Sequence, residues 1–380
     1  MKNRKRLFAL LLSLALAASL CACGSADGDA SASVSPEASL DPDVSPSVEV
    51  DLNQSALEFA AGLSPTDILL TVNGEEVQAD LVCYLLDQYC TQTQQYLAYF
   101  GMSLGDMPDM AVDLLEQGVE WSVYHTIVRQ KAAELGCLLT DGQTAEIKEA
   151  LDDPTLTSQA TLWDLTGQTL RFILELNPYY ENLLDAVTHE PGEEELKEYL
   201  DDQGIFYVKH ILLKTTDDRE QPLSDEEIAG KKALADDLLA QLQAAEDMPA
   251  KFDELMNAYS DDGGLAANPD GYVFDNNDSL VGGFREAALE LEEGQLSGIV
   301  ETAYGYHIML RLAFTDEMLE SYRMDVRLEA MEDQIGQWME AAEVVRADAL
   351  SNLDVLDFYT RLTAYQDALY SEQLAGEGVG

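Results

Sequence analysis

Two of the four histidines in this 380-residue chain stand at matching points of two apolar runs that predict β-strands. His210 lies within Phe206–Leu213, and His307 lies within Tyr306–Leu312, just after a predicted turn at Gly305. Imidazole changes charge near neutral pH and can donate or accept hydrogen bonds at two distinct nitrogens. A pair of histidines in such strands therefore predicts either a hydrogen-bonded polar core or the polar floor of a functional site.

The segment from residue 203 to residue 313 contains the elements that would have to position these histidines. Helices are expected over Ser224–Ala245, Pro249–Tyr259 and Val281–Leu291, and short strands over 272–274 and 299–301. Glycine- and asparagine-rich stretches separate these elements and predict loops. The order strand, helices, strand, helix, strand, strand indicates one small α+β unit.

Six ordered motifs of this segment resemble those of parvulin-type peptidyl-prolyl cis-trans isomerases. They are Val208–Leu212, Ala258–Asp262, Asp270–Phe274, Phe284–Leu289, Glu293–Ser297 and Tyr304–Ile308. With an export signal and helices on both sides, the whole chain resembles the PrsA- and SurA-like foldase lipoproteins. The resemblance implies an α+β fold, in which a parvulin domain is inserted in or follows a mainly helical chaperone domain. It also implies a four-stranded antiparallel sheet with surrounding helices.

The resemblance assigns site roles residue by residue. It implies a catalytic set made of His210, Asp262, His307 and Thr302, and a substrate-proline pocket made of Leu280, Phe284, Phe274 and Tyr272. The two histidines would form the floor, the threonine hydroxyl would complete their hydrogen-bond network, and the acidic group would face the rotating carbonyl. We expect a raised pKa for this carboxyl if it is partly desolvated. Gly271 replaces the family's leucine, so that one wall of the pocket is either missing or supplied by Tyr272.

Isomerisation needs no metal and no cofactor, because rotation about an X–Pro bond crosses a barrier of about 18–20 kcal/mol without breaking any bond. The site has to hold the proline ring and to favour the twisted amide over both planar forms. The loop Lys214–Arg219 lacks the paired basic residues of phosphate-directed parvulins. We therefore expect no requirement for a phosphorylated substrate.

The first 22 residues predict a lipoprotein signal peptide. A basic region precedes the apolar run Leu7–Leu20, which would be only about 21 Å long as a helix and too short for a bilayer core of about 30 Å. The sequence Leu20–Gly24 resembles a lipobox with Cys23 as the acylated residue, and an ordinary secretory signal is the alternative. Residues 23–54 predict a disordered tether. The expected location is extracytoplasmic, lipid-anchored to the outer face of a bacterial cell membrane.

The formal charge of −51, from 21 Lys and Arg against 72 Asp and Glu, excludes nucleic acid as a partner, since phosphate binding needs clustered cations. We favour a solvated acidic coat, and attraction of a cationic client or surface is the alternative. The resemblance implies unfolded or partly folded exported polypeptides with X–Pro bonds as partners, beside the membrane, and a homodimer stays open. Cys83, Cys90 and Cys137 are expected as unpaired thiols, with one bridge to Cys137 left open.

The remaining segments complete a prediction of domains. We expect a helical chaperone-like domain over 55–202, the parvulin domain over 203–313, helices over 314–369 that pack on the amino-terminal domain, and a flexible tail over 370–380. Within the first domain, Asn73-Gly74 predicts a hairpin, Gly136 ends a helix over 110–135, and Thr140 opens another. Separate helices are expected over 161–176 and 178–187, and one over 315–349. The function predicted is a membrane-anchored isomerase and chaperone; the alternative is a non-catalytic, client-holding chaperone on a parvulin scaffold.

Overall fold

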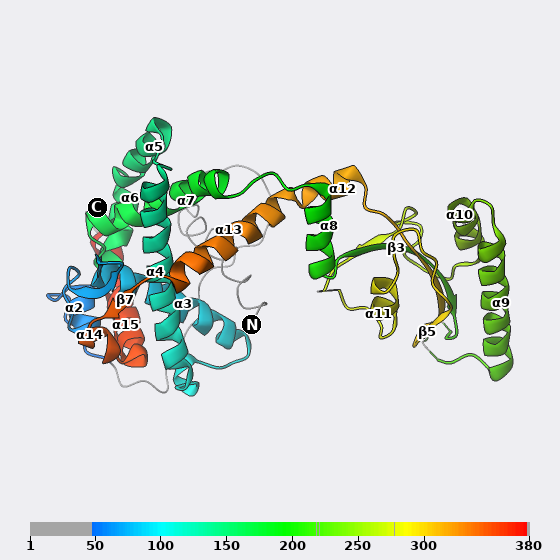
Figure 1. Ribbon diagram of the computed structural model, residues 1–380. Coiled ribbons are helices and arrows are strands. Elements are labelled where there is room, and N and C mark those ends of the chain that lie inside the picture. Colours follow the sequence, from blue (N-terminus) through cyan, green and yellow to red (C-terminus); the bar gives the residue numbers. More distant parts are fainter. Residues whose placement is uncertain (1–47, 218, 220, 277, 378–380) are drawn as a thin grey trace. The chain divides into compact units, whose positions relative to one another are not determined.

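A computed structural model describes residues 48–377 except residues 218, 220 and 277, and these residues form two compact units (Figure 1). The first unit comprises the described residues up to His189 and those from Glu329 on, and the second runs from Glu190 to Leu328. The predicted signal peptide, the lipidation site Cys23 and residues 23–47 of the tether lie outside the described residues. Within the described part, no helix has the length and apolar character needed to cross a membrane.

Helices make up most of the first unit. They are α2 (Ala56–Ala61), α3 (Ala79–Tyr99), α4 (Met110–Leu135), α5 (Asp141–Leu151), α6 (Pro154–Ala160), α7 (Gly167–Val187), α14 (Asp348–Ser351) and α15 (Val355–Glu377), with most of α13 (Arg323–Glu340) and the short turns η1 (Leu104–Asp106) and η2 (Thr161–Trp163). The Thr140 side chain caps α5, and Gly136 ends α4 in the left-handed conformation at φ 74°, as predicted.

A three-stranded sheet of order β2-β1-β7 lies in the same unit. Its strands are β1 (Ile68–Val72), β2 (Glu75–Gln78) and β7 (Val344–Arg346). The predicted hairpin is confirmed, since Asn73 and Gly74 form its two-residue turn with positive φ. The helix predicted through residue 349 was wrong at its end, because residues 344–346 pair antiparallel with the free edge of β1.

Two further predictions for this unit were wrong. Pro178 does not separate two helices but lies inside the single helix α7, which buries apolar residues on both sides of the proline. Helix α15 continues to Glu377, beyond the start of the predicted tail at residue 370. Part of the predicted tether is also in contact with the core, where Val48, Val50 and Leu52 are half-buried.

The second unit is built on a four-stranded antiparallel sheet of order β4-β3-β6-β5, so the predicted sheet and α+β class are confirmed. The strands are β3 (Phe206–Lys214), β4 (Tyr272–Phe274), β5 (Val300–Thr302) and β6 (Gly305–Arg311), and the helices are α8 (Glu193–Asp202), α9 (Asp225–Ala244), α10 (Met248–Tyr259), α11 (Phe284–Leu289) and α12 (Asp316–Ser321). The predicted helix over 281–291 is thus shorter, starting after Gly283.

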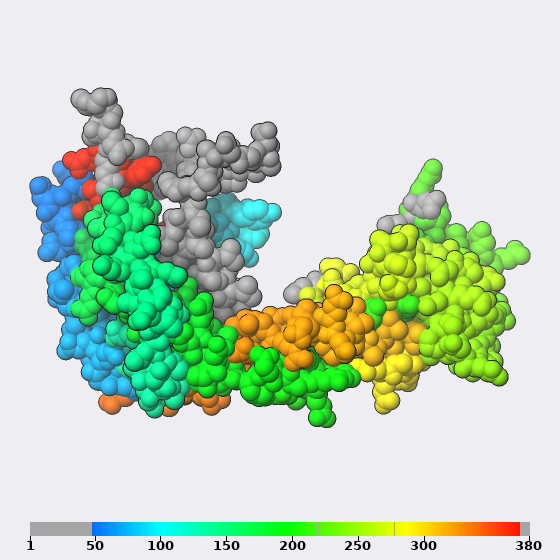
Figure 2. Space-filling view, turned by 90° about the horizontal axis from the view of Figure 1, so that it is seen from above, coloured from blue at the N-terminus to red at the C-terminus, as the bar shows by residue number. Residues whose placement is uncertain are grey.

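Alternation along the strands gives this sheet two different faces. Ile211, Ile308 and Leu310 pack under α9 and α10, which form the yellow-green surface of this unit in Figure 2. Phe206 and Met309 pack under α11 on the other face. His210 and His307 share the α11 face, because they are an even number of residues from Phe206 and Met309 in their strands.

Helices α8 and α12 contribute to the core of the second unit, although the sequence assigns them to the flanking segments. Leu196 and Leu200 of α8 form one buried cluster with Ile205, Phe314 and Leu319. The compact unit therefore extends on both sides beyond the segment 203–313.

Candidate active site

A hollow of about 460 Å³ opens on the α11 face of the four-stranded sheet. Its lining residues are His210, Leu212, Lys214, Thr216, Asp217, Asp262, Gly263, Phe274, Ser279, Leu280, Val281, Phe284, Tyr304 and His307. Six of the eight residues assigned to the site from the sequence are in this group. The other two, Thr302 and Tyr272, do not line the hollow and reach it only through hydrogen bonds to His307 and Asp262.

The two histidines meet through the register of β3 and β6. His307 lies opposite Leu212, and His210 lies opposite Met309, so the imidazoles are diagonal neighbours on one face. Their rings stack at 5.4 Å between centroids, and the Nδ1 atoms are 3.3 Å apart. Both side chains are buried.

Gly305 permits this register at the start of β6. Its φ is 140°, and a Cβ atom there would lie 2.2 Å from the carbonyl oxygen of Leu213. No other residue type fits this close approach of the two strands. The turn glycine thus positions His307, two residues further along the strand.

The polar side chains form one continuous chain of hydrogen bonds. Thr302 Oγ1 lies 2.9 Å from His307 Nε2, and His210 Nε2 lies 3.4 Å from Asp262 Oδ2. An ionised Asp262 can only accept, so His210 donates from Nε2 and accepts at Nδ1. His307 then donates from Nδ1 and accepts the Thr302 hydroxyl proton at Nε2. With Asp262 ionised and both imidazoles neutral, the direction of every proton in the chain is thus fixed.

Hydrogen bonds to Asp262 hold the pKa of its carboxyl well below the usual range. The hydrogen bond from His210 is the largest cause, and those from the Tyr272 hydroxyl and the Gly264 amide add to it against the opposing effect of burial. The bond lengths to oxygen are 2.5 Å for Tyr272 and 3.1 Å for Gly264. The raised pKa expected from desolvation was wrong, because three donors outweigh partial burial.

Tyr272 turns its hydroxyl toward Asp262. Its ring lies 5.5 Å from His210 and stacks on Phe274, and burial together with Asp262 raises the pKa of its phenol to about 12. The hydroxyl is therefore a neutral donor. A Cβ atom at Gly264 would come within 2.6 Å of the Tyr272 oxygen, so that glycine leaves the space which the hydroxyl occupies.

The backbone conformation explains why position 271 is a glycine and not the family's leucine. Its φ is 113°, and a Cβ atom there would lie 2.8 Å from the carbonyl oxygen of Val208. A leucine does not fit this backbone. The missing family leucine is thus a consequence of how the loop before β4 approaches β3.

Aromatic side chains form the apolar wall of the hollow. The ring of Phe284, which is 4% exposed, meets His210 and His307 edge-on at 5.3 and 5.2 Å, and Phe274 lies behind it at 6.0 Å. Burial, followed by the neighbouring His210, lowers the pKa of His307 to about 4. At neutral pH the site therefore joins an apolar socket to a floor in which His307 is uncharged.

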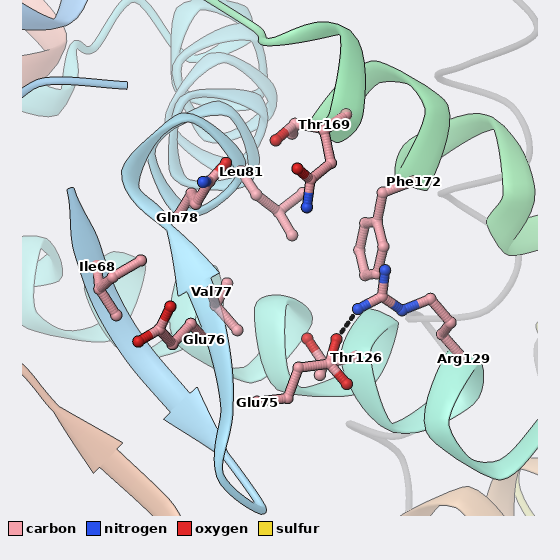
Figure 3. A pocket seen from close by; sticks show the side chains of 11 residues that line it. Ile68, Glu75, Glu76, Val77, Gln78, Leu81, Thr126, Arg129, Thr169 and Phe172 are labelled. Atoms are coloured by element: carbon pink, nitrogen blue, oxygen red, sulfur yellow. Dashed lines mark ion pairs between the residues drawn. The ribbon is translucent and has the colours of Figure 1, made fainter. Parts of the chain in front are cut away.

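A smaller hollow of about 120 Å³ lies in the first unit, between β2, α3, α4 and α7 (Figure 3). Its one guanidinium, that of Arg129, forms an ion pair with Glu75 and lies over the ring of Phe172 at 4.4 Å. The charge is already neutralised, so this hollow offers a ligand no free cation.

Comparison with known proteins identifies the domain that contains the histidine pair. Residues 210–313 match the family described as Rotamase, PPIC-type PPIase domain. This segment is a parvulin domain. The resemblance seen in the sequence motifs of the parvulin domain is thereby confirmed.

Relatives of the chain are named as a chaperone and as a foldase. Over 139 residues the chain is 31% identical to the chaperone SurA of Pseudomonas savastanoi pv. phaseolicola, and this match covers 35% of this chain and 30% of that protein. Over 171 residues it is 30% identical to the foldase protein PrsA 3 of Bacillus cereus, covering 43% of this chain and 59% of that protein.

A crystal structure of the peptidylprolyl isomerase PrsA from Bacillus cereus aligns with 79% of this chain and 99% of its own, at 20% identity and a TM-score of 0.31. The two sequence matches span only about a third of the SurA protein and about three fifths of the PrsA protein. The predicted resemblance to PrsA- and SurA-like foldases is confirmed by the sequence matches over the part of the chain that they cover.

Proposed function

We propose that this protein is a peptidyl-prolyl cis-trans isomerase that assists the folding of exported polypeptides. The observation that carries the proposal is the hollow of the parvulin domain, where the aromatic wall around Phe284 adjoins the His210–His307 floor. An X–Pro segment needs such a combination, since its ring is apolar and its preceding carbonyl is polar. Clients are unfolded or partly folded chains, as the names of the foldase relatives suggest.

Asp262 would act on the carbonyl that precedes the proline. Amide resonance gives the oxygen of a planar peptide a partial negative charge, which decreases as the C–N bond twists. A carboxylate near that oxygen therefore disfavours the planar forms relative to the twisted one. A change of about a quarter charge at about 5 Å, with an effective dielectric constant of about 20, gives about 1 kcal/mol. Asp262 would thus contribute a part of the acceleration, and binding in the Phe284 socket would supply the rest.

The proposal is tested by the isomerisation rate of a prolyl tetrapeptide, measured with the purified protein and with two variants. We expect His210→Ala to reduce kcat/KM by at least tenfold and Asp262→Ala to reduce it about fivefold, which corresponds to about 1 kcal/mol, while circular dichroism stays that of the wild type. A wild-type protein no faster than both variants would exclude catalysis at this site.

The place of action is proposed from the first residues of the chain, which lie outside the described part. We propose that residues 1–22 are removed and that acylated Cys23 anchors the protein to the outer face of the cell membrane. Incorporation of radioactive palmitate into the wild type, and none into Cys23→Ser, is the expected result. Labelling of both proteins would contradict lipidation at Cys23.

A client-holding chaperone without catalysis is the second candidate. The observation that favours it is a set of exposed aromatic side chains on the helical unit, around Tyr99 and Phe100. A protein that lacks residues 190–328 should then still suppress aggregation of an unfolded client, while the whole protein shows no isomerase activity. Complete loss of holding in that deletion variant would count against this candidate.

A further inference from the structure

Exposed apolar side chains gather where α3 is connected to α4. We call this set the tip surface, and it consists of Tyr96, Tyr99, Phe100, Met102, Met107 and Val112, with exposed fractions of 66, 86, 56, 39, 38 and 68%. Figure 2 shows the cyan segment around residue 100 at the surface of the first unit. Tyrosine, phenylalanine and methionine are the residues enriched at the centres of protein interfaces.

Local hydrogen bonds hold the tip surface in place. The amide of Met102 donates to the carbonyl of Leu97 at 3.0 Å, and the amide of Leu104 donates to Gln94 Oε1 at 2.9 Å. The connection therefore folds back on α3 while Leu97 and Leu104 are buried beneath it. The neighbouring apolar side chains stay outside this core.

The aromatic rings of the tip surface contact one another. Phe100 lies edge-on to Tyr96 and to Tyr99, at 5.2 and 5.3 Å between centroids. Three rings thus form an ordered cluster that is at least half exposed at each member. Exposed apolar clusters of this kind mark surfaces that bind a partner.

Carboxylates follow the rings closely in the sequence. Asp106, Asp109 and Asp113 lie in the connection and the start of α4 and are exposed, and the sequence contains no Lys or Arg from Leu7 to Val128. The nearest basic residue in the sequence, Arg129, is paired with Glu75 (Figure 3).

Four of the five other cations among the described residues of the helical unit are engaged elsewhere, and the fifth, Lys148, belongs to α5, which follows the opposite end of the 26-residue helix α4. Arg346 pairs with Glu116, Arg361 donates to the carbonyl of Phe59, and Arg171 and Lys131 pair with glutamates of their own helices. The tip surface therefore carries net negative charge next to its aromatic rings.

This charge decides which partner fits. A second copy would bring the same carboxylates against each other, in a protein whose formal charge is −51. A Lys or Arg side chain, in contrast, is attracted both by the carboxylates and by the faces of exposed tyrosine and phenylalanine rings. The complementary partner thus combines apolar and basic side chains.

We propose that the tip surface binds polypeptide segments in which aromatic or aliphatic residues alternate with Lys or Arg. The proposal rests on the proposed function, in that the protein has to meet unfolded chains. It adds a binding site on the helical unit, made of other residues than the hollow of the parvulin domain, and a preference for basic over acidic segments. Binding at this site does not involve proline.

The test uses the full chain and labelled 12-residue peptides without proline, which share their aromatic residues and carry either Lys and Arg or Asp and Glu. Fluorescence anisotropy gives the affinities at low and high salt. We expect the basic peptide to bind at least tenfold more tightly than the acidic peptide, with weaker binding at high salt. The double variant Tyr99→Ser, Phe100→Ser should lose at least tenfold in affinity for the basic peptide.

Two control variants define the site and its charge preference. Tyr370→Ser removes a ring of the same unit that is 60% exposed, and it should bind as the wild type does. The pair Asp109→Asn, Asp113→Asn should lose most of the preference for the basic peptide and keep the binding of its apolar side chains.

Three results would overturn the proposal. They are equal binding of the basic and acidic peptides, unchanged binding by the Tyr99, Phe100 double variant, and a concentration-dependent dimer in sedimentation that this variant abolishes. The last result would assign the tip surface to a second copy of the chain. The double variant should keep the isomerase activity of the wild type on a short prolyl peptide. If the wild type itself has no isomerase activity, the proposed catalysis is excluded, but the binding of basic peptides to the tip surface is not affected by that result.

Discussion

Removal of the Tyr272 hydroxyl tests whether this side chain holds Asp262 in place and ionised. The hydroxyl donates to Asp262 Oδ2 at 2.5 Å, whereas the other donors, Gly264 N and His210 Nε2, lie at 3.1 and 3.4 Å. Tyr272→Phe keeps the ring against His210 and Phe274 and removes only the shortest of these bonds.

The size of the effect follows from the surroundings of Asp262. A hydrogen bond to a charged group contributes about 1.5–3 kcal/mol, and water replaces part of it because the Asp262 side chain is 18% exposed. Because Tyr272 acts through Asp262, its loss can cost no more than the contribution of that carboxylate, about 1 kcal/mol, so we expect a loss in kcat/KM of up to about fivefold. The loss should appear in kcat, with KM little changed, because Tyr272 does not line the hollow.

The pH dependence should change in a defined direction. Hydrogen bonds keep the pKa of Asp262 below its usual range, and loss of one donor raises it toward the ordinary value for an aspartate. The acid limb of the rate profile should therefore move to higher pH, so that Tyr272→Phe loses more activity near pH 4 than at pH 7.

The measurement is a protease-free assay of cis-to-trans conversion from about pH 4 to pH 8, with a melting temperature for each protein. Tyr259→Phe is the matched control, because this ring belongs to the same unit and is 45% exposed. Identical kcat values and pH profiles for the two variants would refute the positioning role of Tyr272. A kcat loss that only follows a lower melting temperature would refute it as well.

Two further predictions concern stability. His125 is buried among aromatic rings, neither ring nitrogen has a hydrogen-bond partner within the described residues, and burial lowers its pKa from 6.5 to about 3. The contribution of the neutral His125 side chain to the free energy of unfolding is therefore complete above pH 6.5 and decreases by about 1.4 kcal/mol per pH unit below it. Between pH 7 and pH 5 the free energy of unfolding in urea should therefore fall by about 2 kcal/mol more in the wild type than in His125→Phe. Parallel pH curves for the two proteins would contradict this. Gly305→Ala should abolish the β3–β6 register and lower the melting temperature, since its Cβ atom would lie 2.2 Å from Leu213 O. Gly282→Ala is the control, because a Cβ atom there meets open space and the variant should melt like the wild type. Equal melting temperatures of the two variants would contradict the role of Gly305.

Local signals in the sequence predicted much of the fold. The Asn73-Gly74 turn, the Gly136 helix end and the Thr140 cap each depend on the residue itself and its immediate neighbours. These three signals need no information about distant parts of the chain. The four-stranded sheet and the pairing of His210 with His307 at the floor of the site came instead from the family resemblance that the ordered motifs carry.

Contacts between distant segments could not be predicted in the same way. The strand at 344–346 exists because β1 has a free edge, and its own sequence continues the apolar period of the preceding helix. Helix α7 passes through Pro178 because both halves are buried against the rest of the helical unit. The hydrogen bond from Tyr272 to Asp262 needs the empty space beside Gly264, which no spacing in the sequence indicates.

Helices far apart in the sequence share the core of the helical unit, which has a consequence for biosynthesis. Helix α15 packs on α2, and the Arg361 guanidinium donates to the carbonyl of Phe59, 302 residues earlier. A protein that leaves the ribosome or crosses a membrane from its amino terminus cannot complete the helical unit until its last helix has emerged. The second unit, which is continuous in sequence, is free to fold before that. The isomerase domain can therefore be complete in the newly made protein while the space that α15 fills in the helical core is still open to water.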